Sequence, residues 1–165
     1  MDNVLRQILF FIVLVLIQVL LFSNIDYMGY VSPYVYVLFI LSLPLGFNKY
    51  ASLGIAFLLG LVIDMFSNTP GVHISATVAM AYARDYWVGF VLPNNEMGPV
   101  EPSLGKLGLR NFLSYTIGLV LLHHLILFFA EAWSFSLAWF TVLKAVLNTV
   151  ITTLLIVCYY LITKK

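Results

Sequence analysis

The sequence predicts an all-α, polytopic membrane protein in which residues 1–165 form a single integral membrane domain. Of the 165 residues, 62% are hydrophobic and only 9% are charged, against roughly 25% charged residues in an average soluble domain. The apolar residues fall into six runs, and about 20 such residues make a spanning helix. Lysine and arginine outside these runs occur only in alternate connections, which is the usual mark of the cytoplasmic side. These observations predict six transmembrane helices with both termini in the cytoplasm.

The expected spans cover about residues 4–22, 33–45, 50–66, 72–88, 111–130 and 137–162. The first is interpreted as a retained anchor, because the sequence around Phe22 has no small-x-small cleavage site. The second is the shortest, and ends in Pro44 and Gly46. A segment of this length could also be a tilted or re-entrant stretch that other helices shield.

Basic residues between the spans and near the two ends of the chain indicate the orientation. They are Arg6, Lys49, Lys106, Arg110, Lys164 and Lys165. The loops over 23–32, 67–71 and 131–136 contain no lysine or arginine, so six spans place every basic loop on one side. The long loop over 86–110 is rich in proline and glycine and is expected to have little helix. A net charge of +1 argues against binding to nucleic acid.

The third span carries Ser52, Ala56, Gly60 and Asp64, which recur every four residues and share one helix face. Small residues at this spacing let a second helix approach closely. The fourth span repeats the spacing with Ser75, Ala79 and Ala83. We therefore expect these two spans to form a close hairpin around a turn over residues 67–71.

Asp64 places a carboxylate at membrane depth, where an ionisable group is costly and serves packing or function. The favoured interpretation is a structural hydrogen bond to the amides of 67–71 or to His73, with Asp64→Asn tolerated. An interaction or ion-coupling carboxylate is the alternative.

The fifth span contains the adjacent His123 and His124, with Glu131 seven residues after the second. A metal site is possible in principle, but neighbouring helical side chains diverge. A hydrogen-bonded pair between His124 and Glu131 is therefore favoured. Arg84 and Asp85, near the cytoplasmic end of the fourth span, are expected at the membrane surface, and a buried ion pair is the alternative.

The sixth span carries a polar stripe, interpreted first as an assembly face, formed by Thr141, Lys144, Asn148 and Thr152. Lys144 is expected to extend to the outer surface, and Asn148 to bond another helix. The sequence contains no arrangement typical of a catalytic nucleophile, phosphate loop or nucleotide motif, so neither an enzyme nor a cofactor is predicted. The candidate helix-packing or interaction residues are Ser52, Ala56, Gly60, Asp64, Ser67, Gly71, His73, Ser75, Ala79, His124, Glu131, Lys144 and Asn148.

The sequence resembles the MreD family of rod-shape-determining membrane proteins of bacteria. The resemblance covers essentially the whole chain and is strongest in Gly60-Leu61-x-x-Asp64 followed by Ser67, Gly71, His73 and Ala76, with Pro33 leading the second span. One departure is that the long Pro/Gly-rich loop replaces a shorter basic connection, so no cytoplasmic contact is carried over from the family.

The resemblance implies a non-enzymatic adaptor or scaffold subunit of the cell-elongation machinery in the bacterial cytoplasmic membrane, surrounded by lipid. Such a protein supports peptidoglycan synthesis by binding the bitopic protein MreC. Through MreC it would associate with the RodA glycosyltransferase, a penicillin-binding transpeptidase and, indirectly, MreB. The family is also distantly similar to the substrate-binding subunits of energy-coupling-factor vitamin transporters. A membrane subunit that binds a small, vitamin-like molecule is therefore the alternative.

Overall fold

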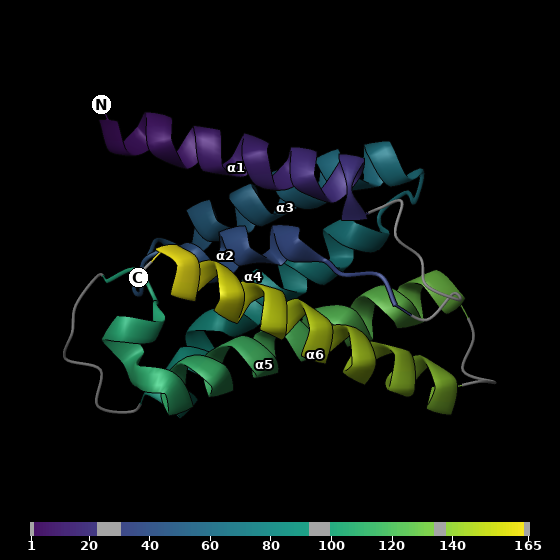
Figure 1. Cartoon of the computed structure of the whole chain (residues 1–165). Coiled ribbons are helices and arrows are strands. Elements are labelled where there is room, and N and C mark those ends of the chain that lie inside the picture. Colours follow the sequence, from purple (N-terminus) through teal and green to yellow (C-terminus); the bar gives the residue numbers. More distant parts are fainter. Residues whose placement is uncertain (1, 23–30, 93–99, 134–137, 164–165) are drawn as a thin grey trace.

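The computed structural model describes residues 2–22, 31–92, 100–133 and 138–163 (Figure 1). The regular elements of these residues are all helical, which confirms the all-α part of the predicted fold class. The elements are α1 (Asp2–Leu20), η2 (Val35–Val37), α2 (Leu38–Ser42), α3 (Lys49–Ser67), α4 (Val72–Val91), α5 (Leu104–Ala132) and α6 (Ala138–Thr163).

The long helices run side by side along one axis of the bundle (Figure 1). The two ends of the chain lie at the same end of the bundle, together with the start of α3 and the start of α5. We call this end the terminal end. The turn between α3 and α4 lies at the opposite end, which we call the turn end.

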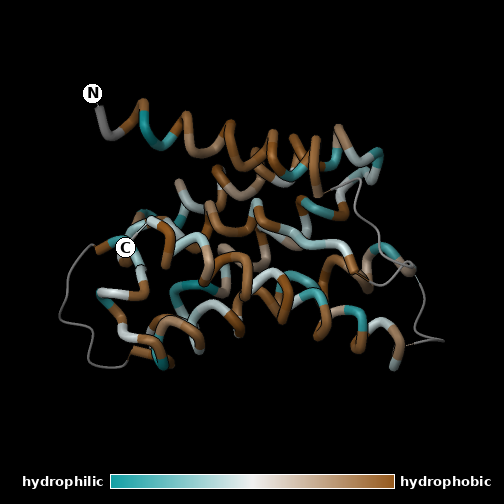
Figure 2. Tube along the Cα trace, in the orientation of Figure 1, coloured by the Kyte–Doolittle hydropathy of each residue, from teal (hydrophilic) through white to brown (hydrophobic). Residues whose placement is uncertain are grey.

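Three helices of the described residues, α3, α5 and α6, are long and apolar enough to cross a membrane. The apolar part of α1, Val4–Leu20, is shorter. Brown, apolar stretches follow these helices in Figure 2. Large apolar side chains remain exposed on them, such as Leu9, Leu58 and Leu154. Exposed apolar surface of this extent marks contact with lipid or with other proteins, as expected of a membrane protein.

The segment predicted as the second span does not form a continuous helix. Within 33–45, only η2 and the five-residue α2 are helical, although Tyr36, Val37 and Ile40 are completely buried. Proline at 33 and 44 limits helix at both ends, because it lacks the amide hydrogen and restricts the preceding residue. The segment is therefore a short helix in the bundle interior, entered through extended backbone.

Side chains of α1 and α6 satisfy this extended backbone. The Asn148 Oδ1 atom accepts the Ser32 amide at 2.7 Å, and the Gln18 Oε1 atom accepts the Val35 amide at 2.8 Å. The Thr152 hydroxyl accepts the Tyr34 amide at 3.2 Å. Irregular backbone is tolerated at membrane depth only when its polar groups find such partners.

The small-residue face of α3 packs closely against α4. Ser52, Ala56, Gly60 and Asp64 are all buried, as the four-residue spacing predicts. A Cβ atom on Gly60 would lie 2.5 Å from Thr77 Oγ1 and 2.6 Å from Ile74 Cα. Only glycine permits this approach, so Gly60 sets the distance between the two helices.

The face that α4 turns toward α3 differs from the prediction. Contact is made through Ile74 and Thr77. The Thr77 hydroxyl lies 3.0 Å from the Ala56 carbonyl across the interface and 2.7 Å from the His73 carbonyl of its own helix. Ser75 is exposed and donates to its own helix, at Val72. The spacing identifies a row of small residues on α4, but the neighbouring face carries the hydroxyl that bonds across the interface.

The predicted loop over 86–110 contains more helix than expected. α4 continues to Val91 and α5 starts at Leu104, while 93–99 lie outside the described residues. Gly108 interrupts α5 with φ 73° and ψ 157°, a conformation that glycine adopts readily. The helical turn before it is stabilised by burial of Leu107 and by a 3.0 Å hydrogen bond from the Tyr160 hydroxyl to the Pro102 carbonyl.

Candidate functional site

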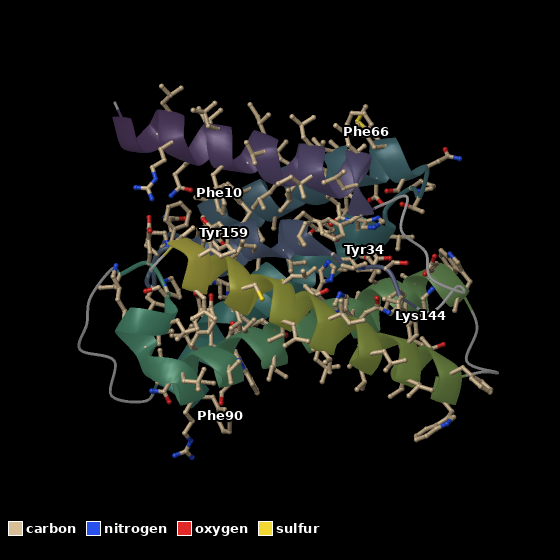
Figure 3. The ribbon with its side chains drawn as sticks, viewed as in Figure 1. Phe10, Tyr34, Phe66, Phe90, Lys144 and Tyr159 are labelled. Carbon is tan, nitrogen blue, oxygen red and sulfur yellow. The ribbon has the colours of Figure 1, made fainter. Side chains whose placement is uncertain are left out.

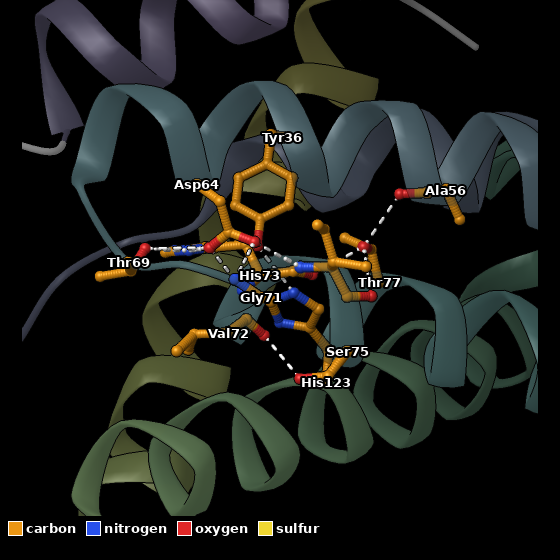
Figure 4. A network of polar contacts seen from close by, with 11 residues as sticks. Tyr36, Ala56, Asp64, Thr69, Gly71, Val72, His73, Ser75, Thr77 and His123 are labelled. Carbon is orange, nitrogen blue, oxygen red and sulfur yellow. Dashed lines mark hydrogen bonds and ion pairs between the residues drawn. The ribbon is translucent and has the colours of Figure 1, made fainter.

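The Asp64 carboxylate is the centre of a hydrogen-bond network between α3 and α4 (Figure 4). Its Oδ2 atom accepts the amides of Gly71 at 3.1 Å and Ile74 at 3.0 Å. Its Oδ1 atom accepts the His73 amide at 2.9 Å, the Thr69 hydroxyl at 2.9 Å and the His73 Nδ1 atom at 3.0 Å. Five donors therefore converge on one buried carboxylate.

This network caps both helices at the turn. The amides of His73 and Ile74 belong to the first turn of α4, where backbone donors lack helical partners and the helix dipole favours a negative charge. Asn68 ends α3 with φ 54° and Gly71 precedes α4 with φ 86°. The predicted structural bonds from Asp64 to the turn and to His73 are confirmed. The carboxylate is satisfied within the chain.

Next to this network, aromatic and imidazole rings form a buried cluster at the turn end. The Tyr36 hydroxyl lies 2.8 Å from His123 Nε2, and its ring centroid is 5.9 Å from that of His73. The Tyr34 ring lies 5.4 Å from the His124 ring and 5.9 Å from the His73 ring. The cluster thus joins the η2 segment to α4 and α5. No periodicity in the sequence links its tyrosines to the histidines, so only the folded chain brings them together.

The expected pair of His124 with Glu131 is wrong. His124 is completely buried, and its Nδ1 atom lies 3.0 Å from the hydroxyl of Thr149 on α6. Glu131 instead pairs with Lys144, whose Nζ atom is 3.5 Å from Glu131 Oε2 and 4.6 Å from the Phe128 ring centre. A spacing of seven residues places His124 and Glu131 on one face of α5, but at different depths along the helix. Each side chain therefore bonds to a different residue of α6.

The adjacent histidines bond in different directions, to Tyr36 and to Thr149. Among the described residues, no three His, Cys, Asp or Glu side chains come together in a group that could hold a metal ion. The Nδ1 atom of His123 and the Nε2 atom of His124 are buried without a hydrogen-bond partner among those residues.

The polar stripe of α6 has an internal role. Asn148 Nδ2 donates to the Lys144 carbonyl at 2.8 Å, while Oδ1 accepts from Ser32. Asn148 was expected to bond another helix, but it bonds the extended segment before η2 instead. Thr141 is half-buried and Thr152 is buried. The stripe holds the η2 segment in place, and its last two residues, Asn148 and Thr152, are completely buried.

Arg84 is the largest fully buried side chain among the described residues, contrary to its expected place at the surface. Its Nε atom donates to the Tyr115 hydroxyl at 2.8 Å, and Nη2 donates to the carbonyls of Leu43 and Pro44. The Tyr115 hydroxyl donates in turn to the Leu41 carbonyl at 3.0 Å. Arg84 therefore binds the carbonyl end of α2, whereas Asp85 is exposed.

Two open grooves lie on the outside of the bundle. The first, the α3–α4–α5 groove, has a volume of about 640 Å³. Its lining residues are Leu53, Phe57, Ile74, Ser75, Val78, Ala79, Tyr82, Ala83 and Leu122. The second, the α1–α3 groove, has a volume of about 440 Å³. Its lining residues are Val4, Gln7, Ile8, Phe11, Phe39, Ile55 and Leu58.

The predicted residues of α3, α4 and the turn between them therefore separate into two sets. Ser52, Gly60, Asp64, Gly71 and His73 belong to the α3–α4 contact and its turn, where Ser67 is half-buried. Ser75 and Ala79 face the α3–α4–α5 groove.

The chain matches no family model, no curated protein and no solved structure.

Proposed function

We propose that the chain is a non-enzymatic membrane adaptor whose main task is to bind other membrane proteins. The observation that supports this best is the α3–α4–α5 groove. Three small residues at four-residue spacing, Ser75, Ala79 and Ala83, line it, whereas Thr77 on the neighbouring face makes the close contact with α3. Small residues on an outward helix face let a further helix approach closely in lipid.

The interior polar groups support the same proposal. The Asp64 carboxylate, with five donors, and the Arg84 guanidinium, with three acceptors, act on the protein's own backbone and side chains. A small-molecule site needs polar groups that converge on an accessible pocket. A structural use of these groups therefore favours the adaptor over a vitamin-binding transporter subunit.

The resemblance to MreD proteins indicates the partner class. We propose that the groove takes the transmembrane helix of an MreC-like bitopic protein in the bacterial cytoplasmic membrane. Through that protein, the chain would associate with a RodA-like glycosyltransferase, a penicillin-binding transpeptidase and MreB, and so support cell shape and peptidoglycan synthesis.

Co-purification from detergent-solubilised membranes tests the adaptor proposal. Wild-type protein is expected to retain an MreC-like partner, whereas Ala79→Trp, which fills the groove, is expected to retain at least about tenfold less, as for a central interface residue. Leu154→Trp is the control, because Leu154 is exposed on α6 away from the groove. Tight stoichiometric binding of a vitamin-sized molecule without any partner would contradict the proposal. If Ala79→Trp and Leu154→Trp retained the partner equally well, the groove would not be the binding site.

We also propose that the chain crosses the membrane six times, with the η2–α2 segment as a shielded crossing and the terminal end in the cytoplasm. Single cysteines at Asn68, in the α3–α4 turn, and at Asn95, between α4 and α5, test this in a Cys158→Ser background. A membrane-impermeant maleimide applied to intact spheroplasts is expected to label the first position only. Labelling of both positions from one side would refute the topology.

A further inference from the structure

A cavity of about 510 Å³ lies at the terminal end, between the start of α1, the segment before α5 and the end of α6. Its walls include Arg6, Gln7 and Phe10 of α1, Lys106 of α5 and Tyr159 of α6. The rings of Phe10 and Tyr159 stack with their centroids 6.0 Å apart, and Figure 3 shows them between α1 and α6. The cavity therefore combines charged groups with an aromatic wall.

Two cations on different helices border this cavity. The side chains of Arg6 and Lys106 are exposed, and neither forms an ion pair with a carboxylate of the described residues. Glu101 is the third charged residue of the lining, so the formal charge of the lining is +1. This charge would balance the single negative charge of one phosphodiester group. Both guanidinium and ammonium groups bind phosphate oxygens through charge-assisted hydrogen bonds.

The cavity continues into a region of different chemistry. Gln7 lines both the cavity and the α1–α3 groove, whose other lining residues are all apolar. The Gln7 Oε1 atom is buried and has no hydrogen-bond partner among the described residues. A polar, positively charged pocket thus adjoins an open groove lined by Ile8, Phe11 and Leu58. Such a pair of sites fits an amphiphile that has an anionic head and an aliphatic chain.

We infer that the terminal end binds one anionic membrane phospholipid. Its phosphodiester contacts Arg6 and Lys106, the hydroxyl-bearing headgroup occupies the cavity, and one acyl chain lies in the α1–α3 groove. This inference depends on the membrane placement proposed above, but not on the adaptor function.

Native mass spectrometry of the delipidated protein in detergent tests the site with three probes. These are phosphatidylglycerol, diacylglycerol with the same acyl chains, and inorganic phosphate. Phosphatidylglycerol is expected to bind at one site, more tightly than diacylglycerol. Arg6→Gln and Lys106→Gln are each expected to weaken it about tenfold, the effect of one lost charge-assisted hydrogen bond. Ile8→Trp keeps both cations but fills the groove, and is expected to weaken lipid binding as well.

Arg110→Gln is the matched control, because Arg110 is exposed on the same helix as Lys106 but does not line the cavity. It is expected to bind phosphatidylglycerol as the wild type does. Equal affinity for diacylglycerol, or an equal loss in Arg110→Gln, would overturn the inference. Displacement of the lipid by an equimolar amount of inorganic phosphate would assign the cavity to free phosphate instead. No partner protein is present, so the outcome is independent of the co-purification experiment.

Discussion

Replacing Asp64 by alanine is expected to lower the free energy of unfolding by about 3 kcal/mol or more, because each buried donor left without an acceptor costs about 1–3 kcal/mol. The alanine removes the acceptor from the amides of Gly71, His73 and Ile74 at once. It also removes the negative charge from the start of α4. The protein should be less abundant in the membrane and should bind its partner more weakly.

Asparagine at this position is expected to give an intermediate loss, unlike the tolerance that the sequence alone predicts. Both Asp64 oxygens accept backbone amides, with Gly71 and Ile74 on Oδ2 and His73 on Oδ1. An asparagine has one carbonyl oxygen, so in either orientation its NH₂ group faces at least one backbone N–H donor. The expected order of stability is therefore Asp, then Asn, then Ala.

Thermal unfolding of the detergent-purified variants, together with their membrane abundance, measures this order. Asp85→Asn and Asp85→Ala are the matched controls, because Asp85 is exposed on α4, and they are expected to behave as the wild type. An ion-coupling carboxylate would give a different pattern. In that case Asn and Ala would be equally inactive, while both proteins remained abundant, stable and assembled.

Replacing Arg84 by methionine is expected to destabilise the protein by about 3 kcal/mol, since hydrogen bonds to a charged group contribute about 1.5–3 kcal/mol each. The carbonyls of Leu43 and Pro44 and the hydroxyl of Tyr115 would lose their donor. Relief from burying a charge offsets part of this loss. Lysine keeps the charge but lacks the planar fork of donors, so Arg84→Lys should fall between methionine and the wild type.

Urea-induced or thermal unfolding in detergent, compared with Arg110→Met, measures the effect of Arg84. Arg110 is exposed on α5, so its loss is expected to change stability by no more than about 0.5 kcal/mol. A wild-type unfolding temperature for Arg84→Met would show that α2 does not depend on this side chain.

The sequence by itself was sufficient to predict several features. Composition predicted the helical membrane class, because lipid offers no partners to backbone groups and favours helices. The four-residue spacing of Ser52, Ala56, Gly60 and Asp64 predicted the close face of α3, since helical geometry alone places them together. The nearby donors of the 67–71 turn and His73 predicted the bonds of Asp64. All of these features depend on composition or on the spacing of residues that lie close together in the sequence.

The tertiary structure decided the contacts between distant segments. Burial of Arg84 depends on the carbonyl end of α2, which lies about forty residues earlier in the chain. His124 bonds Thr149 rather than Glu131 because α6 packs beside α5 at that depth. The segment over 33–45 remains only partly helical because side chains of α1 and α6 satisfy its backbone. Helical periodicity indicates which face a residue occupies, but only packing in three dimensions determines which donor or acceptor lies opposite.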